Sequence, residues 1–239
     1  MGEESSINLI KVKNGESKTL SGKVINTQTI EDGGEKKRKV TIEFGNSFGK
    51  KNINLVEKEP AVFDENQKIE TSKAKDFYMK WKMLKDAGLP VPNTVRITSD
   101  KTVAITDLTV NGSELYGKSD GEKVIFEEYL KPENHRKSKN LDGLFLSVKS
   151  DEIFAEANRI ATIATENNIC LPFDDPLIMI VHPDGTWSLI ILDLGDARKG
   201  PHPDPDLKPT LREQNEWLIS KFFDDIKLIR EKIQKTQAR

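Results

Sequence analysis

Cysteine is almost missing from this chain of 239 residues, which limits how its fold can be held together. Cys170 stands alone, so no internal disulfide is possible, and we expect a reducing, cytoplasmic compartment. Long hydrophobic runs are missing as well. The longest, 177–181, has five residues, far below the roughly 18 that a membrane-spanning helix needs. The N-terminus has no apolar stretch of the secretory kind. We therefore expect no membrane partner.

The chain also lacks an excess of charge of one sign. Its 37 basic and 39 acidic residues leave a net charge of −2, which argues against a nucleic-acid partner bound by a whole-protein positive field. One basic run, Lys36–Lys39, follows Asp32-Gly33-Gly34 and is typical of a solvated turn. Three histidines and one cysteine form no cluster with the spacing of a zinc site.

What the chain does contain is a clear order of elements. The first 58 residues predict an antiparallel meander, because short β-branched runs alternate with glycine turns. A helix is expected over about 70–87, since Phe77, Trp81 and Leu84 recur at helical spacing and Gly88 follows. Later segments are predicted as strands 94–98 and 102–105, a linker over 107–123, a polar and mobile stretch over 131–143, a helix over 150–167, a hairpin over 177–192 and a helix over 211–233.

Several charged residues in this order have the types that phosphoryl transfer from ATP requires. Such a site must position phosphates with a lysine and screen their charge with carboxylate-bound Mg²⁺. Lys58 ends a predicted strand, and Glu70 or Asp76 on the next helix could pair with it. Asp193 follows an apolar strand and precedes Leu194-Gly195, where a carboxylate is costly unless it is paired or ligated. Asp174 and Asp175 lie across the hairpin from Asp193.

Over residues 20–235 these features resemble the protein-kinase-like superfamily, in particular its small aminoglycoside-phosphotransferase-like and atypical protein kinase branch. Leu192-Asp-Leu-Gly195 resembles the Asp-Phe-Gly metal motif, and Ile105-Thr-Asp-Leu108 is similar to the strand that enters the adenine-binding hinge. Residues 84–92 are similar to the helix-to-strand passage of those families. Asp32-Gly33-Gly34 matches the place of the turn that covers the phosphates.

The resemblance implies an α+β, two-lobed fold that binds ATP and Mg²⁺ and phosphorylates a hydroxyl of a small molecule or protein. The implied parts are an N-lobe over 1–108, a hinge and linker insertion over 109–150, and a reduced C-lobe over 151–239 with a catalytic-like loop at 171–176. Asp174 would be the acceptor-side carboxylate, and Asp175 would join Asp193 at the metal. The implied nucleotide-binding residues are Lys58, Asp76, Gly33, Gly34, Asp107 and Leu108.

Departures from the family pattern leave alternatives open. The family has His-x-Asp with an asparagine five residues after the aspartate, but Met179 and Ile180 stand at that distance from Asp174 and Asp175, and the histidine is missing. A catalytically impaired pseudokinase that acts as a nucleotide-binding scaffold or regulator is one alternative, and a non-enzymatic binding adaptor is another. Each motif also has a simpler interpretation: a surface lysine at Lys58, a turn or helix cap before Pro176, and a strand-ending turn at Asp193.

Overall fold

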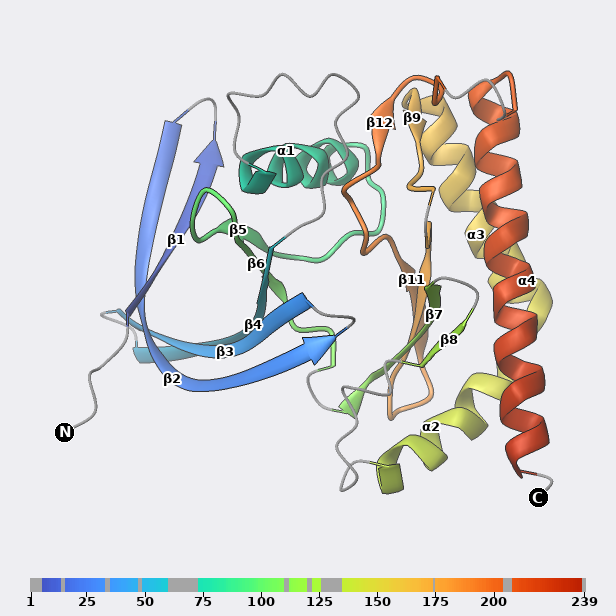
Figure 1. Ribbon diagram of the computed structural model, residues 1–239, viewed down its shortest axis with the longest axis horizontal. Coiled ribbons are helices and arrows are strands. Elements are labelled where there is room, and N and C mark those ends of the chain that lie inside the picture. Colours follow the sequence, from blue (N-terminus) through green and yellow to red (C-terminus); the bar gives the residue numbers. More distant parts are fainter. Residues whose placement is uncertain are drawn as a thin grey trace. The chain divides into compact units, whose positions relative to one another are not determined.

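The computed structural model describes residues 6–13, 16–32, 35–46, 49–59, 73–109, 112–119, 122–125, 135–173, 175–203 and 208–237. The chain divides into two compact units (Figure 1). Unit 1 comprises Met1–Trp81 and Pro92–Asp107, and unit 2 comprises Lys82–Val91 and Leu108–Arg239. Among the described residues, no helix is long and apolar enough to cross a bilayer.

Unit 1 contains a six-stranded antiparallel barrel. Its strands follow the order β1-β2-β3-β4-β6-β5, and pairing of Ile10 with Ile97 closes the ring. The predicted meander is confirmed, and closure into a barrel was not expected from the sequence. A two-lobed kinase arrangement stays a prediction, whereas the mixed α+β class is confirmed. The strand bounds are β1 Ser6–Lys13, β2 Glu16–Asp32, β3 Glu35–Asn46, β4 Gly49–Lys58, β5 Val95–Ile97 and β6 Val103–Thr106.

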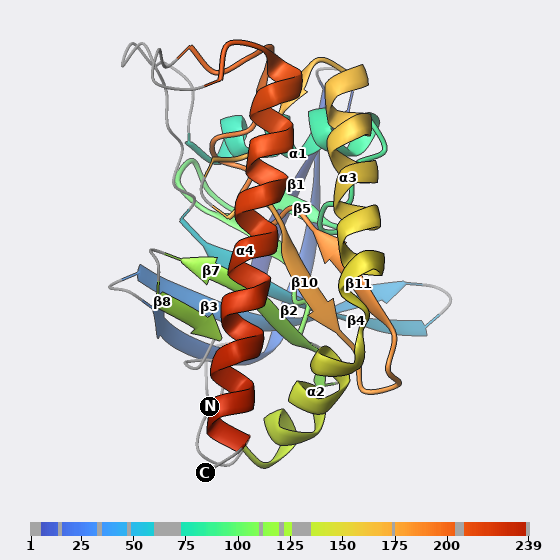
Figure 2. The same ribbon diagram turned by 90° about the vertical axis from the view of Figure 1, so that its right-hand side faces the viewer.

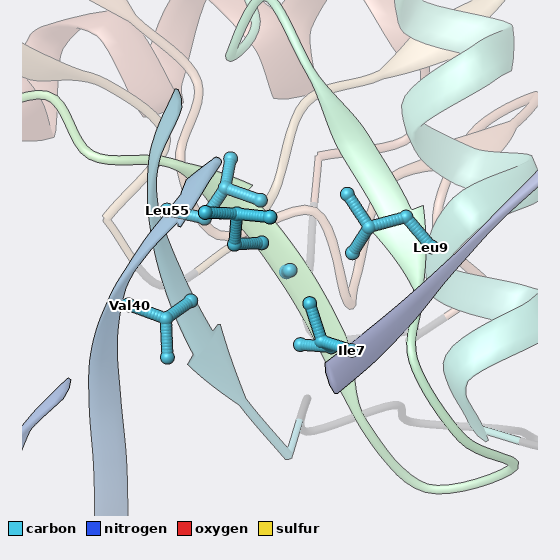
Figure 3. Packing of buried hydrophobic residues seen from close by; sticks show 6 residues of the cluster. Ile7, Leu9, Val40 and Leu55 are labelled. Carbon is cyan, nitrogen blue, oxygen red and sulfur yellow. The ribbon is translucent and has the colours of Figure 1, made fainter. Parts of the chain in front are cut away.

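The barrel core follows from alternation along the strands. Ile7 and Leu9 of β1 are buried while Asn8 between them is exposed, because successive side chains of a strand point to opposite faces. Figure 3 shows Ile7 and Leu9 directed toward Val40 and Leu55 of the facing strands. Each such side chain contributes about 1.5–3 kcal/mol when fully buried. This core stabilises the strand that ends at Lys58.

Helix α1, Lys73–Asp86, begins in unit 1 and carries the predicted apolar stripe. Phe77, Trp81 and Leu84 are all buried, as the helical spacing requires. The amide of Ala74 donates to the carbonyl of Asp100 at 3.3 Å, which fastens the first turn to the β5–β6 connection. Gly88 follows the helix with a φ of 76°, the left-handed conformation that commonly stops a helix.

Unit 2 combines a four-stranded sheet with three helices. The sheet has the order β11-β10-β7-β8, and a separate two-stranded ladder joins β12 to β9. Helices α3 and α4 contact each other and cover one face of the larger sheet (Figures 1 and 2). The bounds are β7 Glu114–Ser119, β8 Glu122–Ile125, α2 His135–Ser147, α3 Ser150–Glu166, β9 Ile169–Cys170, β10 Ile178–Val181, β11 Trp187–Ile190, β12 Arg198–Lys199 and α4 Leu211–Gln237.

Two segments of unit 2 correct the sequence-based expectation. The linker expected over 107–123 contains β7 and the start of β8, and the stretch expected to be mobile over 131–143 contains most of α2. Gly117 suggested a turn, but it lies inside β7, where an added Cβ would come within 3.0 Å of Ile178 on the neighbouring strand. Glycine there permits close strand packing. Tyr116 stacks on Phe145 of α2 with ring centroids 4.0 Å apart.

Candidate functional site

The β10–β11 hairpin is the frame of the candidate site in unit 2. The amide of His182 donates to Thr186 O at 2.8 Å, and the amide of Gly185 donates to His182 O at 2.9 Å. Gly185 has a φ of 85°, which a glycine adopts without strain. These bonds close the tight turn that the sequence predicted, and Ile178 faces Ile190 at the other end of the ladder.

The hairpin register relates the loop before β10 to the turn after β11. Asp175 lies three residues before Ile178, and Asp193 lies three residues after Ile190, its partner in the ladder. Both carboxylates therefore leave the hairpin at the same end, as predicted. Met179 and Ile180 are buried inside β10, so the strand presents apolar side chains at the two positions where the family pattern has its asparagine.

Asp193 sits in a tight turn whose backbone holds its carboxylate. The amide of Gly195 donates to Asp193 Oδ1 at 3.2 Å, and the side chain is partly exposed. Leu194, which lies between Asp193 and Gly195, is fully buried and anchors the turn. Within the described parts of the chain, no protein donor lies at hydrogen-bond distance from Asp193 Oδ2. The turn thus offers one oxygen of a partly exposed carboxylate to a ligand.

Asp175 adopts an unusual backbone conformation. Its φ is 43°, in the left-handed region that few residues other than glycine, asparagine and aspartate adopt. Pro176 follows directly and further restricts the backbone of the residue before it. Strain of this kind is concentrated at functional sites. Asp174, the predicted acceptor-side carboxylate, lies outside the described residues.

The loop before Asp175 is held by side chains from elsewhere in unit 2, of which Asn215 is fully buried. The amide of Leu171 donates to Asn215 Oδ1 at 2.9 Å, and the amide of Phe173 donates to Asp196 Oδ2 at 3.1 Å. Lys221 Nζ donates to the carbonyl of Phe173 at 3.4 Å. The backbone of the predicted catalytic-like loop is therefore held at Leu171 and at Phe173, the two neighbours of Pro172.

Asn215 and Asp196 are functional-site neighbours that the sequence did not indicate. Asn215 is fully buried on α4, where it also donates to Ile169 O at 2.9 Å. Its neighbour Gln214 is 1% exposed and clamps the backbone of His202. A polar pair on the buried face of an amphipathic helix is the one sequence signal that could have located these contacts.

Lys58 and Asp76 are both in unit 1, close to the start of α1. Lys58 Nζ lies over the ring of Phe77, 5.3 Å from its centroid, which joins the end of β4 to the helix. Asp76 precedes Phe77 in α1 and is partly exposed. An ion pair between Lys58 and Asp76 stays a prediction. Gly33 and Gly34, predicted to cover the phosphates, lie outside the described residues.

Asp107 and Leu108, the predicted adenine-binding residues, mark the boundary between the units. The amide of Asp107 donates to Asn54 O at 3.1 Å, and its carboxylate lies 3.4 Å from Lys39 Nζ. The Asp107 amide therefore already donates a hydrogen bond within the barrel. Leu108 packs on the apolar cluster of unit 2. An adenine contact by the backbone here stays a prediction.

Asp175 and Asp193 therefore both belong to unit 2 and adjoin the same end of one hairpin, while Lys58, Asp76 and Asp107 belong to unit 1. No group of three or more histidine, cysteine, aspartate or glutamate side chains arranged for a metal occurs in the described part of the chain. Mg²⁺ usually binds one or two carboxylates together with substrate phosphates and water. Two carboxylates leaving one hairpin end suit that ion in the company of a nucleotide.

No protein-family model matches this sequence, and a search of curated proteins finds no match. A search of solved structures finds a rhoptry kinase from Toxoplasma gondii, with 9% sequence identity and a TM-score of 0.45. The alignment covers 93% of this chain and 66% of that chain, so this chain spans about two thirds of that kinase. At this identity and TM-score the likeness is too slight to assign a family.

Proposed function

We propose that the chain is an ATP- and Mg²⁺-dependent phosphotransferase that acts on a hydroxyl of a small molecule or a protein. The observation that supports it most is the hairpin register, since Ile178 pairs with Ile190 and sends Asp175 and Asp193 off the same end of the ladder. Phosphoryl transfer depends on positioning and charge screening more than on covalent chemistry. Paired carboxylates on a rigid hairpin can supply both.

In this proposal Asp193 and Asp175 hold Mg²⁺, which would neutralise charge on the transferring phosphate. Lys58 binds the phosphates, and Asp76 orients Lys58. Asp174 accepts the proton of the acceptor hydroxyl as a general base. Gly33 and Gly34 cover the phosphates, and the backbone near Asp107 and Leu108 binds adenine.

A second candidate is a pseudokinase that binds the nucleotide without transferring phosphate. The burial of Met179 and Ile180 in β10 favours it, because no amide side chain is supplied there for a second metal ion. The two candidates share nucleotide binding and differ in turnover. Measuring both properties on one preparation separates them.

The test is a thermal-shift titration with ATP and with adenosine, each with and without Mg²⁺. A ligand at about 100 times its Kd adds roughly 2.7 kcal/mol to the free energy of unfolding. Asp193→Asn is expected to abolish the Mg²⁺-dependent part of the ATP shift and to leave the adenosine shift unchanged.

The matched control is Asp224→Asn, an exposed carboxylate of α4 that lies near Lys227. It removes the same charge and should leave every shift as in the wild type. A wild-type protein that shows no ATP shift in either condition contradicts both candidates and favours a non-enzymatic adaptor. ATP binding with no phosphate transfer to any acceptor or to water leaves the pseudokinase.

A further inference from the structure

Asp196 joins three segments that surround the proposed metal turn. Its Oδ2 accepts the amide of Phe173 at 3.1 Å, and its Oδ1 lies 3.9 Å from Arg198 Nη2 and 4.0 Å from His202 Nε2. It stands three residues after Asp193 in the chain. One carboxylate therefore links the loop of the predicted catalytic residues to the turn that follows β11.

The surroundings of Asp196 restrict its position. Its side chain is 16% exposed, and a carboxylate buried to this extent is favourable only when it is paired and hydrogen-bonded. Arg198 belongs to β12, where it pairs with Cys170 of β9, and burial lowers the pKa of its guanidinium. The backbone of His202 is fixed by Gln214 of α4 at both its amide and its carbonyl. The backbones of Arg198 and His202, the two residues that face Asp196 Oδ1, are thus both fixed.

The Asp196–Phe173 bond acts directly before the predicted catalytic residues. Phe173 is the last described residue ahead of Asp174, and Asp175 follows in a left-handed conformation. Asn215 holds the same loop two residues earlier through the amide of Leu171. Hydrogen bonds from amides to carboxylates are about twice as strong as those between neutral groups. Losing this one would release the end of the loop nearest to the chemistry.

We propose that Asp196 is a positioning residue for phosphoryl transfer, which holds residues 171–173 next to the Asp193 turn through the amide of Phe173. The inference rests on the proposed function. Asp196 contacts neither nucleotide nor acceptor in this role and acts through the backbone of the loop. Because misplacing a reacting group by about 1 Å can cost roughly 100-fold in rate, a single amide bond can have a large effect on turnover.

The experiment compares Asp196→Ala and Asp196→Asn with the wild-type chain. Asparagine keeps an acceptor oxygen for the Phe173 amide, and alanine removes it. Two readouts are measured: hydrogen exchange of individual amides by NMR, and kcat and KM for Mg·ATP from the release of ADP, the product of transfer to any acceptor. Asp196→Ala is expected to speed exchange at Phe173 by about 10-fold or more and to lower kcat by about 10- to 100-fold, with KM changed less than about 3-fold. Asp196→Asn should restore most of both.

The matched control is Asp184→Ala at the opposite end of the same hairpin. Asp184 Oδ1 accepts the amide of Thr186 at 2.9 Å, so the control removes the same kind of bond away from the loop. It should leave kcat and the exchange of Phe173 unchanged.

Three results would overturn the inference, and they differ from one another. A wild type that turns over ATP together with an Asp196→Ala variant of equal kcat rejects the positioning role alone. Equal acceleration of exchange at Phe173 and throughout β10 in Asp196→Ala shows general destabilisation and rejects it as well. A wild type that neither binds nor turns over ATP rejects the proposed function and this role with it.

Discussion

Asp175 lies three residues before Ile178, and Asp193 lies three residues after Ile190. These two isoleucines form the last pair of the β10–β11 ladder. This relationship places the two carboxylates at one end of a hairpin whose other end is a tight, hydrogen-bonded turn. A rigid frame of this kind is what a site built for charge screening requires.

The backbone conformation of Asp175 predicts different outcomes for two substitutions. Asp175→Asn keeps a side chain that tolerates a left-handed φ, so stability should stay within about 0.5 kcal/mol of the wild type. Asp175→Ala should cost roughly 1 kcal/mol more, because alanine disfavours that conformation. Both should raise the Mg²⁺ concentration needed for ATP binding to the same extent. Chemical denaturation and Mg²⁺ titration measure the two effects, and equal stabilities of the two variants would argue against strain.

Replacing Gly22 with alanine is predicted to destabilise the barrel. A Cβ there would lie 2.3 Å from Ile42 Cγ2 and 2.8 Å from the Phe44 ring, so Gly22→Ala should destabilise the protein by about 1–3 kcal/mol. Gly143→Ala is the matched control, since Gly143 lies in α2 with no neighbouring atom within 4 Å of a Cβ. It should stabilise the protein by about 0.5–1 kcal/mol through helix propensity. Urea unfolding of both variants checks the pair, and a neutral Gly22→Ala would show that the barrel interior relaxes.

Replacing Glu114 with glutamine is predicted to stabilise the protein in a pH-dependent way. Tyr116 has one hydroxyl hydrogen, yet its oxygen lies 2.9 Å from Glu114 Oε2 and 3.0 Å from Asp142 Oδ1. Burial raises the pKa of Glu114 above its usual value. A raised carboxyl pKa means that stability is fully present below the unfolded-state pKa near 4.5 and is lost as pH rises through the folded-state pKa. Glu114→Gln should therefore be more stable than the wild type at pH 7, by about 1 kcal/mol or less, and equal to it near pH 4.

Denaturation of Glu114→Gln at a series of pH values makes this measurement. Tyr116→Phe is its companion variant, because it keeps the stacking on Phe145 and removes the shared hydroxyl. A Glu114→Gln variant that is less stable than the wild type at pH 7 would mean that the charged carboxylate stabilises the fold.

Cys170 is predicted to be unreactive in the folded protein. Burial, the largest cause, raises the pKa of its thiol to about 11. At pH 8 about one thiol in a thousand would then be thiolate, so alkylation should be slow until the protein unfolds. The raised pKa of the thiol contributes stability that is present below the unfolded-state pKa of 9 and is lost as the pH rises through the folded-state pKa of about 11. Mass spectrometry after iodoacetamide treatment, with and without denaturant, checks it; rapid labelling of the native protein would contradict the burial.

Local signals predicted the elements that local physics controls. Helix α1 was anticipated because Gly88 and the spacing of Phe77 and Trp81 lie within a few residues of each other. The β10–β11 hairpin was anticipated for the same reason, through its glycine turn. Barrel closure by Ile10 and Ile97 was not, because these residues meet only after the whole unit has formed.

The contacts around the candidate loop depend on distant partners. Asp196 meets Phe173 across 23 positions, and Asn215 meets Leu171 across 44. No periodicity or turn pattern in a single sequence encodes which buried amide will serve a given backbone group. Gly117 was wrongly interpreted as a turn residue. It lies in a strand, where the side chain of Ile178 on the neighbouring strand leaves little room for a Cβ.

The dependence of Leu171 on Asn215 has a consequence for how the protein is made. Chains grow from the N-terminus at about 5–20 residues per second, so a separation of 44 residues delays this bond by about 2–9 s after Leu171 is added. The strands β1 to β4 pair with their immediate neighbours in the chain and have no such delay. The β1–β4 part of the barrel can therefore pair on the ribosome as soon as its strands emerge, while the loop of the candidate site still requires the synthesis of α4.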